Sequence, residues 1–301
     1  MGHPFRRAVL QPWGISTRQL AGFRGPSGLV HYVPMNALIS ALHAAMDEAA
    51  REVMAIYADP ERFDTRRKED DSPLTAADLA AHHCFCRHLA AATPDIPILS
   101  EESAKVAWEE RRQWHRCWIV DPLDGTKEFL KRNDEFTLNV ALVEAGRVVL
   151  GMVDAPALKR RYYGAEGLGA WRRDGEEPPR PLQVATPPEG ERPWRVVGSR
   201  SHANPDTQAF IDQLPAAEVV PMGSSLKICL IAEGAADIYP RLGPTCEWDT
   251  AAAQAVVEQA GGQVLNAETG EPLDYNRRES LLNPHFIACA GRHPAWQLPT
   301  A

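Results

Sequence analysis

The chain has 301 residues, 44% hydrophobic and 24% charged, which is typical of a globular protein with a sizeable core in one large or two closely packed domains. Its net charge of −8 argues against nucleic acid as a generic partner, but small phosphorylated ligands stay open because bound metal ions can reverse the local sign. No apolar run approaches the roughly 20 residues of a membrane span. The six cysteines lack the spacing of a disulfide framework, so we expect a soluble, cytoplasmic protein with reduced thiols.

Residues 1–34 contain no acidic residue but several arginines, glycines and prolines. An organellar transit peptide shares this acid-poor composition, whereas a secretory signal needs an apolar stretch that is missing here. We favour a disordered extension, because a helix is predicted to begin directly after it. From residue 36 to 57, apolar side chains recur at the spacing of one face of an amphipathic helix.

A charged segment at residues 66–73 breaks this pattern and predicts an exposed loop or hairpin. A second helix is predicted to begin at Thr75. Asp78, three residues later, fits an acidic variant of the capping box, in which the two residues satisfy each other's backbone N–H groups.

This second helix carries a dense group of metal-ligand side chains: His82, His83, Cys84, Cys86 and His88. Helical spacing predicts two neighbouring pairs, His82 with Cys86 and Cys84 with His88. The pairs lie about 200° apart around the helix, so they cannot converge on one ion. Because neither pair completes a tetrahedral site, we interpret these residues as surface and core residues and not as a zinc site.

The stretch around which the chain is organised is Trp118-Ile119-Val120-Asp121-Pro122-Leu123-Asp124-Gly125-Thr126. An apolar run at residues 117–120 predicts a buried strand, and Pro122 is expected to end its ladder because proline has no N–H. The acidic residues then fall on a tight turn, with Gly125 free to take a positive φ. A plain surface turn is the alternative. It is disfavoured because Glu101 and Glu102 follow a similar short strand at residues 97–100.

Alternating apolar residues at 136–143, followed by segments at 148–153 and 159–163, predict an antiparallel meander. Residues 172–192 are rich in proline, glycine and charge, and mark the expected seam between two subdomains. Beyond the seam, strands and helices alternate, which is typical of an α/β layer. We therefore predict an α+β metal-binding subdomain at 35–180 and an α/β substrate-binding subdomain at 181–301.

Five carboxylates are expected at the ends of these elements: Glu101, Glu102, Asp121, Asp124 and Asp249. Acidic groups gathered without His or Cys suit hard cations, above all Mg²⁺. A bound cation also explains how several carboxylates can lie together without repelling each other. Taken alone, Asp249 has an equally good interpretation as an acid in the first turn of a helix.

Features that favour anions come from the second half of the chain. Gly223-Ser224-Ser225 precedes a helix and is expected to offer backbone N–H groups and hydroxyls to an anion, although an ordinary serine cap fits equally well. Lys227 and Arg241 add positive charge, and Ser199 with His202 follows a comparable strand. Together with the acidic group, these residues predict a metal-dependent site for a phosphate ester between the two subdomains.

Three motifs in this order closely resemble the signatures of the inositol-monophosphatase superfamily: Glu101-Glu102-Ser103, Asp121-Pro122-Leu123-Asp124-Gly125-Thr126 and Trp248-Asp249-Thr250-Ala251-Ala252. Other segments resemble its CysQ-type 3'(2'),5'-bisphosphate nucleotidases: residues 71–78, 125–133, 199–202, 223–227 and 239–241. The resemblance covers roughly residues 36–290. It implies a layered αβαβα sandwich and a lithium-sensitive, Mg²⁺-dependent phosphatase.

The resemblance also implies roles for individual residues. Two or three Mg²⁺ ions would be held by Glu101, Asp121, Asp124, Asp249 and the Leu123 carbonyl, with Glu102 next to them. Asp78 and Thr126 would orient and deprotonate the attacking water. Substrate contacts would come from Thr126, Gly125, Ser199, His202, Gly223, Lys227 and Arg241.

The function implied is hydrolysis of the 3'-phosphate of adenosine 3',5'-bisphosphate to AMP and phosphate, which clears a by-product of sulfate assimilation. An inositol or sugar-phosphate phosphatase is the closest alternative, and residues 127–129 with Lys227 favour the nucleotide. A non-catalytic nucleotide-binding regulator is a further alternative, but a binding protein has no need of a water-activating pair. A homodimer and peripheral association with the inner membrane are further expectations from the resemblance.

Overall fold

The computed structural model describes residues 33–67, 73–198 and 205–297. The helices are α1 (Met35–Tyr57), α2 (Ala76–Ala92), α3 (Trp108–Arg111), α4 (Thr126–Lys131), α5 (Pro205–Ile211), α6 (Leu226–Ala232) and α7 (Ala251–Gln259), with 3-10 helices η1 (Pro60–Arg62), η2 (Glu101–Ser103), η3 (Pro156–Leu158) and η4 (Glu247–Asp249). The strands are β1 (Arg66–Arg67), β2 (Pro73–Leu74), β3 (Ile98–Ser100), β4 (Arg116–Asp124), β5 (Thr137–Glu144), β6 (Arg147–Ala155), β7 (Arg160–Ala165), β8 (Gly169–Asp174), β9 (Arg180–Pro181), β10 (Trp194–Gly198), β11 (Ala217–Pro221), β12 (Ile238–Arg241), β13 (Gln263–Asn266) and β14 (Phe286–Cys289).

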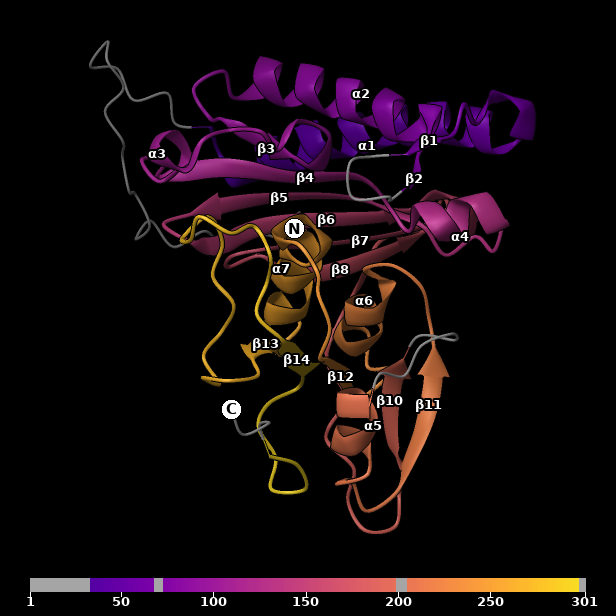
Figure 1. Ribbon diagram of the computed structural model, residues 1–301, viewed down its shortest axis with the longest axis vertical. Coiled ribbons are helices and arrows are strands. Elements are labelled where there is room, and N and C mark those ends of the chain that lie inside the picture. Colours follow the sequence, from indigo (N-terminus) through magenta and orange to yellow (C-terminus); the bar gives the residue numbers. More distant parts are fainter. Residues whose placement is uncertain (1–32, 68–72, 199–204, 298–301) are drawn as a thin grey trace, which may run out of the picture. The chain divides into compact units, whose positions relative to one another are not determined.

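From α1 onward, the elements stack in layers (Figure 1). Helices α1 and α2 pack on each other and on one face of a seven-stranded sheet, and α7 and α6 cover the opposite face. The other side of α6 contacts a five-stranded sheet, and α5 packs against β12 of that sheet. This is the αβαβα sandwich predicted from the sequence.

The seven-stranded sheet has the order β3-β4-β5-β6-β7-β8-β9, and β3 alone pairs in parallel with its neighbour among these strands. Every residue of β4 from Cys117 to Leu123 is buried, as the apolar run predicted. The prediction that Pro122 ends this strand is wrong. Strand β4 pairs with β5 as far as Asp124, and a bulge between Asp121 and Asp124 accommodates the residue that lacks an N–H. The chain turns only at Gly125, whose φ is +86°.

The five-stranded sheet has the order β11-β10-β12-β14-β13. Strands β10, β11 and β12 pair in parallel, as expected for the α/β half. Strand β14 pairs antiparallel with both β12 and β13, and neither β13 nor β14 was predicted. Part of the segment at 172–192, expected as a seam, belongs to the seven-stranded sheet, because β8 extends to Asp174 and β9 pairs with it. The division of residues 35–301 into two subdomains stays a prediction.

Helix α7 lies directly on the backbone of β6 and β7. A Cβ atom at Gly151 would overlap the carbonyl oxygen of Ala252, and one at Gly164 would lie 2.8 Å from the carbonyl oxygen of Ala255. Glycine at these two positions therefore permits helix and sheet to approach closely. The arrangement matters for the site, because Asp249 immediately precedes α7 and Asp121 belongs to the same sheet.

Helix α1 begins and ends close to the predicted positions, and α2 begins where it was predicted to begin. Thr75 and Asp78 form the predicted capping box: the Thr75 side chain accepts the N–H of Ala77, and Asp78 Oδ2 accepts the Thr75 N–H at 2.8 Å. Strands β1 and β2 form the predicted hairpin. Residues 1–32 of the predicted extension and the predicted substrate residues Ser199 and His202 lie outside the described residues.

Candidate active site

Three carboxylates that are far apart in the sequence meet where β4 ends and α7 begins. One oxygen from each of Asp121, Asp124 and Asp249 lies within 4.8 Å of the others. Asp121 is 1% exposed, and its Oδ1 accepts the backbone N–H of Leu123 across the bulge. The bulge thus directs both acidic residues of β4 to the same place, opposite η4.

The protonation of these carboxylates reflects their crowding. Burial raises the pKa of Asp121 well above its usual value, and repulsion from Glu101, Asp124 and Asp249 raises it further. Burial also raises the pKa of Asp124 to about 6, although Lys227 acts against it. Burial and Asp124 raise the pKa of Asp249 to about 7. All three groups therefore bind protons more readily than a free aspartate.

Glu101 lies beside this group, as predicted. It begins η2 directly after β3, which pairs in parallel with β4, so the two strand ends lie side by side. A hydrogen bond with Glu101 contributes to the raised pKa of Asp121. Glu102 is the next residue of η2 and is partly exposed. From α2, His82 Nδ1 lies 2.9 Å from the Ser100 hydroxyl and holds the residue that precedes Glu101.

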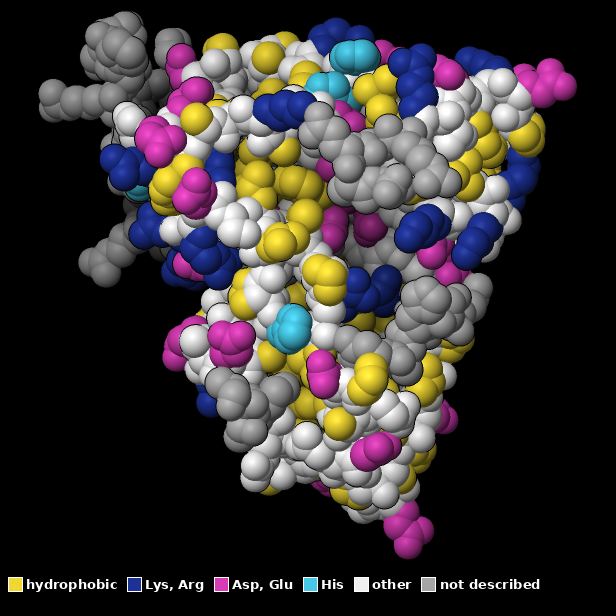
Figure 2. Space-filling model, viewed as in Figure 1, with side chains coloured by type: hydrophobic (Ala, Val, Ile, Leu, Met, Phe, Trp, Pro, Cys, Tyr) yellow, Lys and Arg dark blue, Asp and Glu magenta, His cyan; other side chains and the backbone are white. Residues whose placement is uncertain are grey.

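The oxygen donors fit a hard divalent cation, since Asp121, Asp124 and Asp249 are carboxylates whose mutual repulsion a cation would relieve. No cysteine or histidine belongs to this group of three. On the face in Figure 2, acidic side chains lie in a hollow with basic side chains next to them. This region of the chain can hold a metal ion.

Asp78 and Thr126 lie within hydrogen-bonding distance, as the resemblance implied. The Thr126 hydroxyl lies 3.3 Å from Asp78 Oδ1 and 3.3 Å from the Leu123 carbonyl oxygen. Asp78 is 1% exposed, and its Oδ2 accepts from both the N–H and the hydroxyl of Thr75. One oxygen of Asp78 is thus fixed by the helix cap, while the other faces Thr126.

A pocket adjoins the carboxylates and contains most of the predicted anion contacts that the structure describes. It is lined by Asp124, Ser224, Ser225, Lys227, Ile228, Tyr239, Arg241, Thr245, Asp249, Thr250 and Phe286. Lys227 Nζ donates to the Ser224 carbonyl at 2.8 Å and lies 5.9 Å from the centre of the Tyr239 ring. Burial lowers the pKa of Lys227, although Asp124 acts against it.

The family model for inositol monophosphatases matches residues 35–296. The chain belongs to the inositol monophosphatase family. It is 49% identical over 239 residues to the 3'(2'),5'-bisphosphate nucleotidase CysQ of Salmonella typhimurium, a match that covers 79% of this chain and 94% of the relative. CysQ of Escherichia coli strain K12 is 47% identical over the same shares. The solved structure of CysQ from Bacteroides thetaiotaomicron matches with a TM-score of 0.75 and 40% identity, over 86% of this chain and 99% of that one.

In this family member, Asp124 is held by residues that the sequence did not predict for this role. The Ser225 N–H donates to Asp124 Oδ2, so it is not available to an anion as expected. The Ser225 hydroxyl lies 2.8 Å from Asn139 Oδ1 and 2.9 Å from the Thr137 hydroxyl. Thr137 and Asn139 were the available signal, because they are polar residues on a strand that is otherwise apolar and buried.

Gly223 is positioned by packing against the loop that follows α4. A Cβ atom there would lie 2.9 Å from the Glu135 carbonyl oxygen and 3.0 Å from Cγ of Glu128. Only glycine fits this contact without a shift of the backbone. The predicted substrate residues Gly125 and Gly223 therefore lie near each other, since Gly125 also packs against Glu128 and the Glu135 carbonyl oxygen.

Proposed function

We propose that this chain is a metal-dependent 3'(2'),5'-bisphosphate nucleotidase that removes the 3'-phosphate of adenosine 3',5'-bisphosphate to give AMP and phosphate. The observation that carries the proposal is the convergence of Asp121, Asp124 and Asp249 beside the Asp78–Thr126 pair. The similarity to CysQ proteins over 94% of their length supports the choice of substrate. Clearing this by-product of sulfate assimilation is the role that follows.

Asp121, Asp124 and Asp249, with Glu101 and the Leu123 carbonyl, would hold two or three Mg²⁺ ions, and Glu102 would support them. When bound, such ions lower the pKa of water and offset the charge of the phosphate. The raised pKa values of Asp124 and Asp249 mean that protons compete with the metal for these ligands. Turnover should therefore require more metal as the pH falls below 7.

Besides holding the metal ions, the chain contributes to catalysis by accepting a proton from the attacking water. The attacking water passes its proton to the Thr126 hydroxyl, whose hydrogen passes to Asp78 Oδ1. Asp78 Oδ2 cannot take part in the same way, because the Thr75 N–H and hydroxyl already occupy it. The capping box thus holds the general base in place.

Substrate contacts are proposed for Gly125, Thr126, Gly223, Lys227 and Arg241, with Ser199 and His202 from outside the described residues. Lys227 and Arg241 both line the pocket and bring positive charge to an anionic ligand. Arg241 is steadied by donating to the Pro244 carbonyl at 2.9 Å. An anionic nucleotide fits this basic wall better than the neutral ring of an inositol phosphate does.

The proposal is tested by measuring phosphate release from adenosine 3',5'-bisphosphate and from inositol 1-phosphate, side by side, with Mg²⁺ and with added Li⁺. We expect release from the nucleotide that Li⁺ inhibits. A preference for inositol 1-phosphate would keep the metal chemistry and overturn the substrate. Release from neither would favour the non-catalytic regulator.

Cytoplasmic location, peripheral membrane association and a homodimer stay predictions. Within the described ranges, no helix has the combined length and hydropathy needed to cross a membrane. None of the six cysteines, which all lie within the described ranges, forms a disulfide. Sedimentation of the purified protein would establish whether it dimerises.

A further inference from the structure

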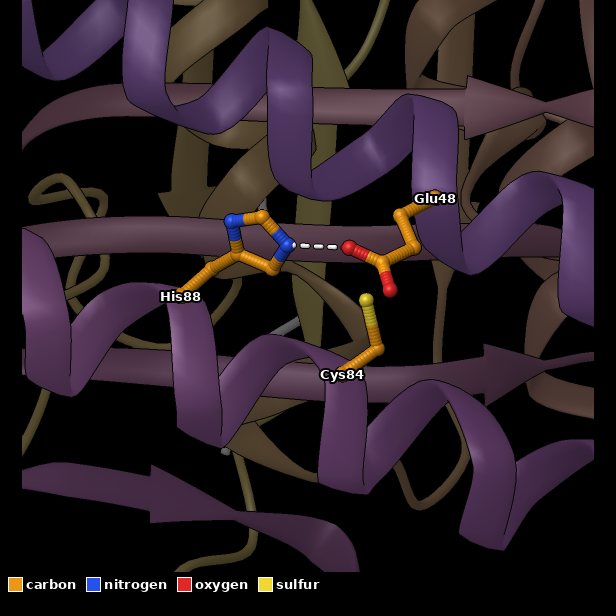
Figure 3. Close-up of side chains that lie close together, drawn as sticks. All are labelled: Glu48, Cys84 and His88. Carbon is orange, nitrogen blue, oxygen red and sulfur yellow. Dashed lines mark hydrogen bonds and ion pairs between the residues drawn. The ribbon is translucent and has the colours of Figure 1, made fainter.

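Helices α1 and α2 bring together a second group of metal-ligand side chains, separate from the acidic group. Glu48 comes from α1, and Cys84 and His88 come from α2. One ligand atom from each lies within 4.8 Å of the others. Figure 3 shows the Glu48 carboxylate between the imidazole and the sulfur, with all three side chains pointing into the space between the helices.

The contacts within this group are short and defined. His88 Nε2 lies 2.6 Å from Glu48 Oε2, and the side chains of both residues are about one-third exposed or less, so solvent ions can reach them. Cys84 is 1% exposed and its thiol lies 3.6 Å from the Ala45 carbonyl oxygen. Helical spacing predicted the pairing of Cys84 with His88, but no third ligand was evident from the sequence. Glu48, 36 positions before Cys84, supplies it.

We propose that Glu48, Cys84 and His88 form a binding site for a thiophilic divalent cation, with Zn²⁺ the best match. Sulfur, imidazole and carboxylate are the ligands that zinc takes in proteins, and a water molecule would complete a tetrahedral site. This site differs in chemistry from the oxygen-only group at Asp121, Asp124 and Asp249, so the two should select different metals.

Three interactions must be displaced when the ion binds. The hydrogen bond between His88 Nε2 and Glu48 Oε2 opens so that both side chains can face the ion, and its proton leaves to solvent. Arg87 donates to Glu48 Oε1 at 2.6 Å, but its side chain is 58% exposed, and such a surface pair contributes little. The Cys84 S–H bond breaks as the sulfur–metal bond forms, and the proton leaves to solvent. Burial, together with Glu48 and Glu52, raises the pKa of this thiol to about 11, although Arg87 and Arg51 act against the rise. Metal binding must therefore overcome the tendency of the thiol to keep its proton.

Binding here would join α1 to α2. The two helices form the outer layer on the seven-stranded sheet, and α2 carries Asp78 at its first turn and His82 against Ser100. An ion held by one ligand from α1 and two from α2 would resist separation of the helices. The role inferred is structural, since the group lies more than a turn along α2 from Asp78.

The test uses Co²⁺ as a probe with the full-length protein in excess Mg²⁺, which occupies oxygen ligands. A thiolate ligand gives cobalt an intense charge-transfer band in the near ultraviolet, whereas the acidic group gives none. We expect this band at one ion per chain, with loss of the band on adding one equivalent of Zn²⁺. The band should vanish in Cys84→Ser and persist in the matched controls Cys86→Ser and Cys246→Ser.

Glu48→Gln keeps every thiol, so it tests the site even if the Cys84→Ser variant fails to fold. It should lower the affinity for Co²⁺ by more than about tenfold, since even partners of metal ligands are worth 10- to 100-fold. Absence of the band in the unmodified protein, or a band that survives in Cys84→Ser, would overturn the proposal. Equal affinity in Glu48→Gln and the unmodified protein would overturn it as well.

Discussion

Asp121 and Asp237 are both buried, at 1% and 4% exposed, yet their pKa values move in opposite directions. Burial alone would raise the pKa of Asp237, but hydrogen bonds from Arg195 and Arg192 outweigh it and the pKa falls. The guanidinium of Arg195 lies 2.8 Å from Asp237 Oδ1. The charge of this carboxylate is balanced by the chain itself.

The charge of Asp121 is not balanced in this way. Its neighbours are Glu101, Asp124 and Asp249, so repulsion adds to burial and the pKa rises. Lys227 and Arg241 lower the pKa of Asp124 and Asp249, respectively, but both values stay raised, at about 6 and about 7. The two regions differ in what surrounds the buried carboxylate: basic side chains face Asp237, whereas other carboxylates face Asp121, where a cation from solution would relieve the repulsion.

The largest expected effect is on activity. Asp121→Asn and Asp249→Asn should lower Mg²⁺-dependent turnover by at least about 10³-fold, because each loses a charged ligand worth several kcal/mol in the transition state. Folding should survive, because asparagine can still accept from the Leu123 or Cys246 N–H. Phosphate release measures the effect, and Glu271→Gln, at an exposed position, is the control. Retained turnover would show that this carboxylate is not a metal ligand.

Asp78 is a third buried carboxylate, and the hydroxyls of Thr75 and Thr126 lie against its two oxygens. Thr126→Ala should lower kcat by about 10²-fold with little change in metal affinity, because the proton acceptor loses its relay. Thr126→Ser keeps the hydroxyl and should recover most of the activity. If alanine and serine give the same rate, Thr126 has no part in proton transfer.

The pH dependence of folding stability should distinguish the carboxylates around Asp121 from Asp237. Between about pH 4 and pH 7 the folded protein binds more protons than the unfolded chain at Asp124 and Asp249, so the metal-free protein should lose stability as the pH rises. We expect a loss of about 1–3 kcal/mol from this source. Asp237 contributes with the opposite sign, since its lowered pKa stabilises the fold above about pH 4 and that contribution is lost in acid.

Urea unfolding at pH 5 and pH 8, with a chelator or with Mg²⁺, measures this difference. In the metal-free protein, Asp249→Asn should reduce the loss of folding stability between pH 5 and pH 8. Asp237→Asn should instead lower the free energy of unfolding at both pH values. A metal-free protein that is more stable at pH 8 than at pH 5, with Asp249→Asn unchanged, would contradict the assignment of repulsion to this group.

The smallest expected effect concerns the support of Asp124. Ser225→Ala removes the hydroxyl that links Asn139 and Thr137 but keeps the N–H that Asp124 accepts. Stability should fall by about 1 kcal/mol, because buried Asn139 loses a partner. Metal affinity should fall by about tenfold. Ser224→Ala, on the same loop, is the matched control, and equal metal affinity in both variants would remove Ser225 from the support of Asp124.

The sequence predicted elements where one physical cause dominates. Apolar periodicity gave α1, the Thr75–Asp78 spacing gave the start of α2, and the run before Asp121 gave β4. These features depend on neighbours in the chain, so local patterns reveal them. The candidate metal ligands came instead from the resemblance of three motifs to the inositol-monophosphatase superfamily.

The remaining features depend on contacts between distant residues. Strand β4 continues past Pro122 because β5 supplies a partner across a bulge, which no pattern around Pro122 reveals. The Ser225 N–H was expected to face an anion or belong to an ordinary serine cap, whereas it donates to Asp124, 101 positions earlier. Glu48 meets Cys84 and His88 only because α1 and α2 pack together. Strands β13 and β14 are four residues each, too short for a periodicity to be clear.

The contact of α7 with Gly151 and Gly164 has a consequence for thermal motion. A helix held away from a sheet by long side chains can shift as those side chains change rotamer. Here the backbone of α7 lies against the backbone of β6 and β7, so no intervening side chain can change rotamer and alter the distance between Asp249 and β4. The spacing of the carboxylates should therefore change little with temperature, and metal affinity should persist until the protein unfolds as a whole.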